Sequence, residues 1–311
     1  MSLAMVFPGQ GSQAQGMQAD LAAAHGEVEA CYAEASEILG YDLWRVVQDG
    51  PAERLAETTV TQPAMLAAGY AAWQVWRKSG GAVPERLSGH SLGEYTALVC
   101  AEAMRFADAV RVVKRRSELM QGAVPAGEGA MAALLGLDDD AVIRICEEAS
   151  TIGVAEPVNF NSPGQVVIAG HSTAVNQAVE YAKEHGAKRA IVLRVSVPSH
   201  SSLMRDAGDK LAETLADTEI RTPAITVVSA ASGTPYGDPD DIRTRLAAQV
   251  YSPVLWVRTV KAMLDDGVTH VVECGPGKVL AGLVRRIDRN TRVDAIDSVA
   301  GLEKALADPD N

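Results

Sequence analysis

The sequence lacks the cysteine and histidine patterns that are typical of metal-binding proteins and of exported proteins stabilised by disulfides. Its 311 residues include four cysteines, which are scattered through the sequence as Cys31, Cys100, Cys146 and Cys274. No C-x-x-C pair occurs, and no cysteines and histidines cluster at the spacing of metal ligands. We therefore expect reduced thiols, a cytoplasmic protein and no bound metal.

An excess of positive charge and long apolar runs are also lacking. The formal net charge is −12 at pH 7, which argues against nucleic-acid binding, because phosphate contacts depend on accumulated Lys and Arg. The first residues, MSLAMVFPGQ, have no basic segment, and no apolar run is long enough to cross a membrane. Neither export nor a membrane span is expected. The overall composition, with 47% hydrophobic and 22% charged residues, is typical of a globular enzyme with a large core.

The order of apolar runs and helical patterns predicts two domains. Most of the chain alternates short apolar runs with amphipathic stretches, in the rhythm of an α/β domain. From Gly129 the order changes to strand, helix, strand, strand, helix and strand, which is the ferredoxin-like order. We predict a larger α/β domain at 1–127 and 199–311, with a small ferredoxin-like domain inserted at 128–198. The expected helices include 18–39, 62–79, 92–103, 203–216, 239–250 and 278–288, and the last strand of the small domain is expected at 188–197.

A glycine-rich turn follows the first apolar run, in MVFPGQGSQAQG at 5–16. Gly9, Gly11 and Ala14 loosely match a dinucleotide-binding fingerprint, but the helix expected after them is not followed by a strand carrying an acidic residue. GPGK at 275–278 lacks the upstream glycine and the Ser or Thr of a P-loop. Two interpretations of the glycine-rich turn therefore remain: it contributes to an oxyanion site, or it is a tight turn without a catalytic role.

Residues 89–93 read GHSLG and match G-x-S-x-G, the nucleophile elbow. Flanking glycines let the chain turn sharply, so that the Ser91 hydroxyl is lifted to the start of a helix. A strand-like run precedes the motif and the helical LGEYTALVCAEA follows it, as the elbow requires. The alternative is a tight strand-to-helix turn that happens to contain a serine.

A nucleophilic serine needs a base, and His200 is the best placed of six histidines. It lies in VSVPSHSS, where the small domain ends and the larger one resumes, and so faces the expected cleft. No acidic third member is evident, because Asp206 and Asp209 lie a turn or more along the next helix. A backbone or amide carbonyl can orient the imidazole instead.

Helical periodicity singles out Arg116 in the segment FADAVRVVKRRSELMQ at 106–121. At 100° per residue, Arg116 falls on the apolar side, while Arg111, Lys114 and Arg115 fall on the opposite side. A buried guanidinium is costly without a partner. Either an internal acid neutralises it, as a structural salt bridge, or an arriving anion does.

Several motifs together resemble one enzyme family, the standalone malonyl-CoA:acyl carrier protein transacylases of fatty acid synthesis. Besides Arg116, the motifs that carry the resemblance are FPGQGSQ (7–13), GHSLGEY (89–95), NFNSPGQVVIAG (159–170), VPSH (197–200), QVYSPVLW (249–256) and ECGPGKVL (273–280). They span nearly the whole chain. The resemblance implies an α/β-hydrolase-like core with a ferredoxin-like insertion, in agreement with the periodicity.

The resemblance also implies a role for each site residue. Ser91 becomes the nucleophile and His200 its base, and the main-chain carbonyl of Gln249 orients the imidazole. The backbone N–H groups of Gln10 and Leu92 form the oxyanion hole, which gives the first glycine turn a function. Arg116 becomes the clamp for the malonyl carboxylate, a bidentate role suited to a planar guanidinium.

The implied reaction is ping-pong acyl transfer through a malonyl-serine ester. Malonyl-CoA is the substrate, CoA leaves, and the acceptor is the phosphopantetheine thiol of acyl carrier protein, so no cofactor is bound by the enzyme itself. The alternatives are an acyl hydrolase of the same fold, a trans-acting acyltransferase of polyketide synthesis and a non-catalytic carrier-binding module. A buried Arg116 argues against a general hydrolase, and intact Ser91 and His200 argue against the binding module.

Carrier proteins of this pathway are usually acidic, so an enzyme with a charge of −12 needs a local basic surface. We predict that Lys188 and Arg189 of the small domain, with Arg285 and Arg286 of the last helix at 278–288, form this docking patch. The alternative is ordinary solvated charge. A monomer is expected.

Overall fold

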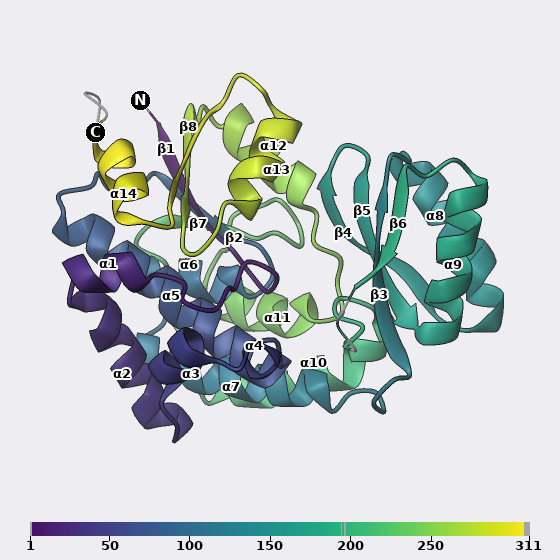
Figure 1. Ribbon diagram of the computed structural model, residues 1–311, viewed down its shortest axis with the longest axis horizontal. Coiled ribbons are helices and arrows are strands. Elements are labelled where there is room, and N and C mark those ends of the chain that lie inside the picture. Colours follow the sequence, from purple (N-terminus) through teal and green to yellow (C-terminus); the bar gives the residue numbers. More distant parts are fainter. Residues whose placement is uncertain (1, 194, 196, 308–311) are drawn as a thin grey trace.

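The computed structural model of the protein describes residues 2–193, 195 and 197–307. Its larger sheet is parallel, and the strand order is β7 (Thr226–Val228), β2 (Arg86–Gly89), β1 (Leu3–Phe7), β8 (His270–Cys274) and β9 (Arg292–Ile296) (Figure 1). All residues of β1 and β8 are buried. Such continuous burial is expected for parallel strands that helices cover on both faces.

Helices form a layer on each face of this sheet. One layer consists of α1 (Ala19–Ala24), α2 (Glu27–Leu39), α3 (Leu43–Asp49), α4 (Ala52–Leu55), α5 (Thr58–Lys78), α6 (Gly93–Cys100), α7 (Phe106–Gln121), α10 (Arg205–Ala216), α11 (Pro239–Gln249) and α14 (Val299–Leu306). The other consists of α12 (Trp256–Asp265) and α13 (Val279–Ile287). Met5 and Phe7 pack in the first layer, whereas Ala4 and Val6 pack in the second, because successive side chains of a strand point to opposite faces.

A second, antiparallel sheet has the order β4 (Ala155–Ser162), β5 (Gln165–His171), β3 (Gly129–Leu135) and β6 (Arg189–Val192). Helices α8 (Asp139–Ala149) and α9 (Ser172–Glu184) pack on one face, over a core that includes Ile145 and Val175. They lie on the side away from the larger sheet (Figure 1). The opposite face carries a small apolar cluster with Met131 and Val167, and it is turned toward the rest of the molecule.

The edge strand β4 joins the second sheet to the larger part of the fold. Val254, shortly after α11, donates its N–H to the carbonyl of Val158 at 2.8 Å, and the Val254 carbonyl accepts from the N–H of Phe160 at 2.9 Å. This two-way pairing fixes the bare face of the small sheet beside the end of α11. The end of α11 is also where Gln249 lies.

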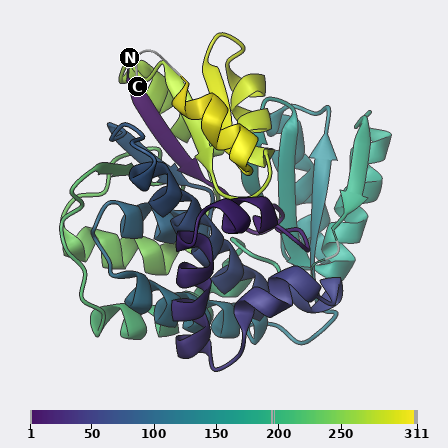
Figure 2. The same cartoon turned by 60° about the vertical axis from the view of Figure 1, so that its left-hand side comes forward.

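The first and last helices of the chain lie side by side. In Figure 2, α14 (yellow) lies next to α1 (purple) in front of the larger sheet. The N–H of Val299, the first residue of α14, donates to the carboxylate of Asp20 in α1 at 2.9 Å. Among the residues described, no helix is both long and apolar enough to cross a membrane.

Several helix limits differ from the sequence prediction, and local backbone geometry explains two of the differences. The helix expected at 18–39 is divided at His25, whose extended backbone ends α1, and α2 restarts after Gly26. The helix expected at 92–103 ends at Cys100, because Glu102 adopts a positive φ of 60°. The last strand of the small sheet ends at Val192, whereas 188–197 was expected; positions 194 and 196 lie outside the described residues. Unexpected elements are α3, α4, α12, β9 and α14.

Candidate active site

Ser91 lies in a sharp turn between the end of β2 and the start of α6. Its φ of 53° is in the left-handed region, which a serine adopts only at a cost. The two glycines of the motif are needed for space. A Cβ at position 89 would lie 1.9 Å from the carbonyl carbon of Gly93, and a Cβ at position 93 would lie 2.0 Å from the carbonyl oxygen of Phe7. The sequence motif therefore has the geometry of an elbow that presents the serine at the carboxyl end of the parallel sheet.

His200 is in hydrogen-bond contact with Ser91. Its Nε2 lies 2.8 Å from the Ser91 Oγ, and its Nδ1 lies 2.9 Å from the main-chain oxygen of Gln249 and 3.0 Å from that of Ser252. Carbonyl oxygens only accept hydrogen bonds, so Nδ1 carries the proton and Nε2 is left as the acceptor of the Ser91 hydroxyl proton. This arrangement orients the His200 imidazole through carbonyl groups, without an acidic third residue, and leaves Nε2 able to accept a proton.

The surroundings of His200 favour its neutral form, with one proton on the ring. The residue is 4% exposed, its φ is 68° and its N–H donates to the carbonyl of Val250 at 2.9 Å. Burial and then the nearby Arg116 cation lower the pKa of His200 to about 3, although the hydrogen bond to the Gln249 carbonyl opposes this. At neutral pH the imidazole is therefore free to accept a proton.

Arg116 is buried on α7 on the side that helical periodicity predicted, and it is 1% exposed. Its guanidinium donates to three neutral acceptors: Gln62 Oε1 at 2.6 Å, Gln249 Oε1 at 3.1 Å and Ser91 Oγ at 3.2 Å. Its buried Nε has no hydrogen-bond partner, and among the described residues no carboxylate forms an ion pair with it. Burial lowers the pKa of Arg116 from its usual value. The sequence left an internal salt bridge open; no carboxylate of the described residues contacts this cation directly, although the charge of the nearby Glu94 favours the ionised guanidinium.

The side chain of Gln249 is a site component that the sequence reasoning missed. It is fully buried. Its Nε2 donates to the main-chain oxygen of Ser91 at 2.9 Å, and its Oε1 accepts from Arg116. The motif QVYSPVLW implied a role only for the main-chain carbonyl of this residue. Nothing in the sequence pattern indicated that the same residue also contacts the nucleophile and the guanidinium.

The first glycine turn packs directly against the elbow. A Cβ at Gly9 would lie 2.5 Å from the carbonyl oxygen of His90 and 3.7 Å from the Leu92 nitrogen, so glycine is needed for this close approach. Gln10 and Leu92 both line the cavity that contains Ser91. Neither of their N–H groups has an acceptor within the described part of the chain. Two open donors beside a serine hydroxyl are the arrangement that an oxyanion hole requires.

One cavity of about 360 Å³ lies between the two sheets, and Ser91, His200, Arg116, Gln10 and Leu92 all line it. Ser91, His200 and Arg116 meet apolar side chains from both parts of the fold, namely Met120, Met131, Leu193, Val195 and Val197. The predicted docking residues are not among the cavity-lining residues; Lys188, Arg189, Arg285 and Arg286 lie on the surface. Within the described residues, no group of His, Cys, Asp and Glu side chains has the geometry of a metal site.

The site combines a serine in an elbow, a histidine oriented by carbonyl groups and two backbone N–H groups without an acceptor among the described residues. This combination is suited to acyl transfer. Comparison with known proteins agrees with that chemistry. The chain belongs to the acyl transferase domain family, which it matches over residues 4–306. It is 52% identical over 303 residues to a malonyl CoA-acyl carrier protein transacylase of Escherichia coli K12, covering 97% of this chain and 98% of that protein.

Solved structures agree with this assignment. An acyl carrier protein S-malonyltransferase from Vibrio cholerae has a TM-score of 0.95 and 52% identity, covering 98% of this chain and 99% of its own. A malonyl-transacylase solved in complex with a type II polyketide acyl carrier protein has a TM-score of 0.97 and 50% identity, covering the same shares. The fold is therefore the α/β fold of these enzymes, with a parallel and an antiparallel sheet.

Proposed function

We propose that this protein transfers the malonyl group from malonyl-CoA to the phosphopantetheine thiol of acyl carrier protein, by a ping-pong mechanism through a malonyl-Ser91 ester, and so supplies fatty acid chain elongation. The observation that carries the proposal is the buried Arg116 cation 3.2 Å from the Ser91 hydroxyl. A serine nucleophile beside a cation without a direct carboxylate partner fits an acyl group that carries its own carboxylate.

The first half-reaction forms the acyl-enzyme. His200 Nε2 takes the proton of the Ser91 hydroxyl as Oγ attacks the thioester carbonyl carbon. The N–H groups of Gln10 and Leu92 stabilise the negative oxygen that develops. The C–S bond then breaks, and the CoA sulfur leaves with the proton from His200. The Nδ1–H bonds to the Gln249 and Ser252 carbonyls stabilise the transient imidazolium.

The second half-reaction uses the same groups in reverse order. The phosphopantetheine thiol of the carrier protein gives its proton to His200, and the sulfur attacks the ester carbonyl of malonyl-Ser91. The bond between that carbon and the Ser91 oxygen breaks, and Oγ takes the proton back from His200. This scheme uses no cofactor held by the enzyme, because the phosphopantetheine belongs to the partner protein.

Arg116 supplies selectivity for a carboxylated acyl group. The guanidinium donors that now bind the neutral side chains of Gln62, Gln249 and Ser91 can be offered to the two carboxylate oxygens of a malonyl group. A neutral acyl chain would leave the buried cation without a directly bound anion, which is unfavourable. A general acyl hydrolase of this fold is therefore a poorer fit to the site.

A trans-acting acyltransferase of polyketide synthesis is the second candidate, and one comparison favours it. The relative solved with a type II polyketide carrier protein is half identical to this chain over nearly its full length. The active-site chemistry would be the same for both pathways. The identity of the carrier protein that accepts the malonyl group separates the two.

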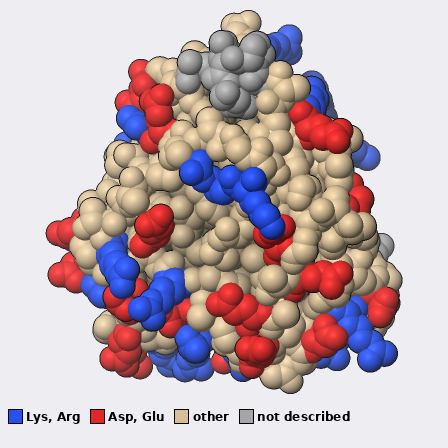
Figure 3. All heavy atoms as spheres, turned by 90° about the vertical axis from the view of Figure 1, so that its left-hand side faces the viewer, with Lys and Arg blue, Asp and Glu red and all other residues tan. Residues whose placement is uncertain are grey.

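Docking of an acidic carrier protein is assigned to Lys188, Arg189, Arg285 and Arg286. Arg286 donates to the side chain of Gln165 at 2.6 Å, and Gln165 and Arg189 both pair with Leu135 across the small sheet. This places the end of α13 beside the end of the small sheet that carries Arg189. On the face seen in Figure 3, by contrast, acidic and basic side chains are interspersed, and the residues described there form no broad basic area.

The remaining structural assignments belong to the same proposal. The larger part of the chain, 1–127 and 199–311, is the α/β-hydrolase-like domain, and 128–198 is the ferredoxin-like insertion. Support comes from the strand order of the second sheet and from its separate apolar core. The cytoplasmic location and the monomeric state stay predictions from the sequence.

Mass spectrometry of the intact protein tests the function. After incubation with malonyl-CoA, the protein is expected to gain the mass of one malonyl group, and addition of holo acyl carrier protein should remove it and malonylate the carrier. Ser91→Ala should gain nothing. Equal malonylation of Ser91→Ala would refute the acyl-enzyme, and loss of the group to water without carrier malonylation would favour a hydrolase. Parallel assays with fatty acid and polyketide carrier proteins separate the two pathways.

A further inference from the structure

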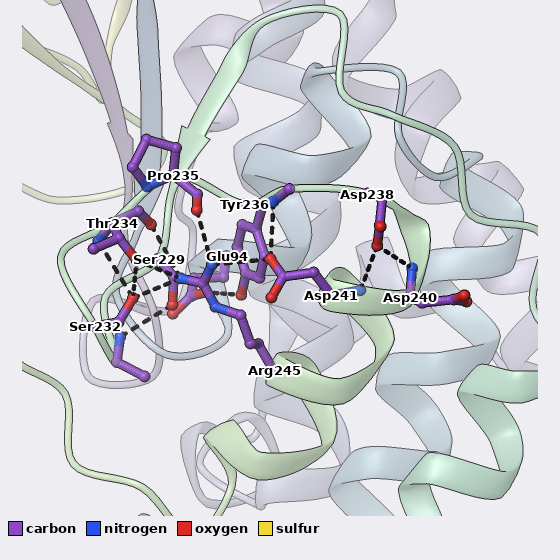
Figure 4. Close-up of polar contacts among 12 residues, drawn as sticks. Glu94, Ser229, Ser232, Thr234, Pro235, Tyr236, Asp238, Asp240, Asp241 and Arg245 are labelled. Atoms are coloured by element: carbon purple, nitrogen blue, oxygen red, sulfur yellow. Dashed lines mark hydrogen bonds and ion pairs between the residues drawn. The ribbon is translucent and has the colours of Figure 1, made fainter.

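A buried carboxyl group, Glu94, lies near the start of α6, three residues after Ser91. Its side chain has no exposed surface. One carboxyl oxygen accepts from the backbone N–H of Ala230 at 3.0 Å, and the other accepts from the hydroxyl of Tyr236 (Figure 4). Within the described residues, no lysine or arginine pairs directly with this carboxyl group. Burial raises the pKa of Glu94, and hydrogen bonds from Tyr236 and Gln249 oppose the rise.

Glu94 and Gln249 meet at the carbonyl oxygen of Ser91, which accepts from the Glu94 backbone N–H at 3.1 Å and from Gln249 Nε2 at 2.9 Å. A glutamine amide has donors only on its nitrogen and an acceptor only on its oxygen. The Gln249 Nε2 group donates to the Ser91 carbonyl at 2.9 Å, and Oε1 must then face Arg116, from which it accepts. A hydrogen bond from Gln249 also lowers the pKa of Glu94, and only the Nε2 group can donate it, so the Glu94 carboxylate favours this orientation of the amide and disfavours its reverse. The same residue holds the His200 imidazole through its main-chain carbonyl.

Arg245 extends the hydrogen-bond network around Glu94 and Tyr236 toward the protein surface. It lies one turn before Gln249 on α11, and its Cζ lies 4.3 Å from the centre of the Tyr236 ring. Figure 4 shows its guanidinium among polar groups of the loop that leads to Tyr236. Its hydrogen-bond partners are the Pro235 and Thr234 carbonyls, the Ser232 and Thr234 hydroxyls and the Asp241 carboxylate. The loop and α11 are thereby held together around the hydroxyl that reaches Glu94.

We propose that Glu94 is a positioning residue that acts through Gln249: with Tyr236, it fixes the Gln249 amide so that Oε1 faces Arg116 and Nε2 faces the Ser91 main chain. The inference rests on the proposed malonyl transfer. It predicts that Glu94 determines substrate preference, because the Arg116 guanidinium depends on Gln249 for one of its acceptors. A residue that only fills the core would affect folding without changing which acyl group is preferred.

The test compares acylation of Ser91 in wild type, Glu94→Gln and Tyr236→Phe. The rate constant for acyl-enzyme formation is measured by rapid quench and mass spectrometry at saturating malonyl-CoA, and again with acetyl-CoA. Glu94→Gln offers Gln249 both a donor and an acceptor, so the amide orientation is no longer enforced. We expect malonylation to fall about 10- to 100-fold, the usual effect of losing a hydrogen bond to a charged group. Acetylation should fall less, so the malonyl-to-acetyl ratio drops. Tyr236→Phe should shift the ratio in the same direction.

Glu273→Gln is the matched control. Glu273 is also a fully buried carboxyl group, but it accepts from the N–H groups of Leu280 and Ala281 at the start of α13. This variant should lower the melting temperature and leave the malonyl-to-acetyl ratio unchanged. An unchanged ratio in both Glu94→Gln and Tyr236→Phe would overturn the positioning role, and so would an equal change in Glu273→Gln. If wild type itself forms no malonyl-Ser91, the proposed function fails before any substitution is made, and this inference fails with it.

Discussion

The guanidinium of Arg116 and the base His200 both contact the hydroxyl oxygen of Ser91. Arg116 Nη2 lies 3.2 Å from Ser91 Oγ, and His200 Nε2 lies 2.8 Å from it. The cation therefore acts on the catalytic pair before any substrate is bound, and it is one cause of the low pKa of His200. A carboxylate that binds to Arg116 would offset this positive charge. If Arg116 binds the malonyl carboxylate as proposed, substrate binding and the pKa of His200 are coupled at the Ser91 hydroxyl oxygen.

This coupling predicts an unusual pH dependence. Because the pKa of His200 is lowered to about 3 in the free protein, the imidazole stays unprotonated as pH falls from 8 toward 5. We expect kcat/KM for acylation by malonyl-CoA to show no loss from His200 protonation over that interval, since kcat/KM reports groups of the free enzyme. Arg116→Ala removes the cation, so the pKa of His200 rises and the acid limb should move to higher pH.

Acyl-enzyme formation with acetyl-CoA provides the fair comparison for the Arg116 variant, because acetyl-CoA does not need the cation. The histidine C–H resonances followed by NMR over the same pH range give an independent reading of His200. Identical acid limbs in wild type and Arg116→Ala would show that the cation does not control the base.

Replacing His200 with Ala should slow both half-reactions, because the same imidazole accepts the proton from Ser91 and from the carrier thiol. General base catalysis typically contributes about 10²- to 10⁴-fold, and each step should lose a factor in this range. Pre-steady-state acylation and carrier-dependent deacylation measure the two steps separately. His185→Ala, at an exposed position, is the control. Wild-type rates in His200→Ala at neutral pH would indicate a different base.

Prediction from the sequence succeeded best for structural features that depend on a single helix or a single turn. Burial of Arg116 follows from helical phase alone, because residues three and four apart share a helix face, and the structure confirms it. The turn at Ser91 follows from two glycines that no other residue can replace without a clash. Short helices such as α3 and α4 were missed, because a few residues of apolar pattern in 43–55 do not distinguish a helix from a loop.

Contacts between distant elements were not predictable in the same way. Gln249 belongs to the end of α11, Arg116 to α7 and Glu94 to α6, and only the tertiary fold brings them together. A single sequence contains no periodicity that relates these three positions. The family resemblance implied that the Gln249 carbonyl takes the place of an acidic third residue, whereas the second carbonyl, that of Ser252, was not predicted and is seen only in the geometry around the Nδ1 atom of His200.

Reversing the charge of the docking patch should weaken the carrier step alone. In Lys188→Glu/Arg189→Glu and in Arg285→Glu/Arg286→Glu, repulsion of an acidic carrier should raise the KM for carrier protein, with a stronger effect at low salt because exposed charges are screened. Loading from malonyl-CoA should be unchanged. Arg45→Glu/Lys210→Glu, at exposed positions on α3 and α10, makes the same change in net charge elsewhere. A similar rise in KM in this control would refute a specific docking patch.

Arg116 itself gives the most discriminating test of substrate selectivity. In Arg116→Ala, malonyl transfer should lose roughly 2–5 kcal/mol, the usual cost of removing one partner of a buried charge pair, which is about 30- to several thousand-fold in kcat/KM. Transfer of an acetyl group should change far less, because no carboxylate then depends on the guanidinium. The two glutamine acceptors, Gln62 and Gln249, lose their donor in this variant, so some loss of stability is also expected.

Arg116→Lys separates charge from geometry. A lysine keeps the positive charge, but its ammonium cannot make two parallel hydrogen bonds to a carboxylate, and it cannot span Gln62 and Gln249 as the planar guanidinium does. We therefore expect Arg116→Lys to recover little of the malonyl activity. The measurement is kcat/KM for malonyl-CoA and acetyl-CoA with wild type and both variants, at a temperature below all melting transitions. If the two substrates lose activity in parallel, Arg116 supports the structure of the site and does not select the malonyl carboxylate. If only malonyl transfer loses activity, the Arg116 cation binds the carboxylate of the substrate directly.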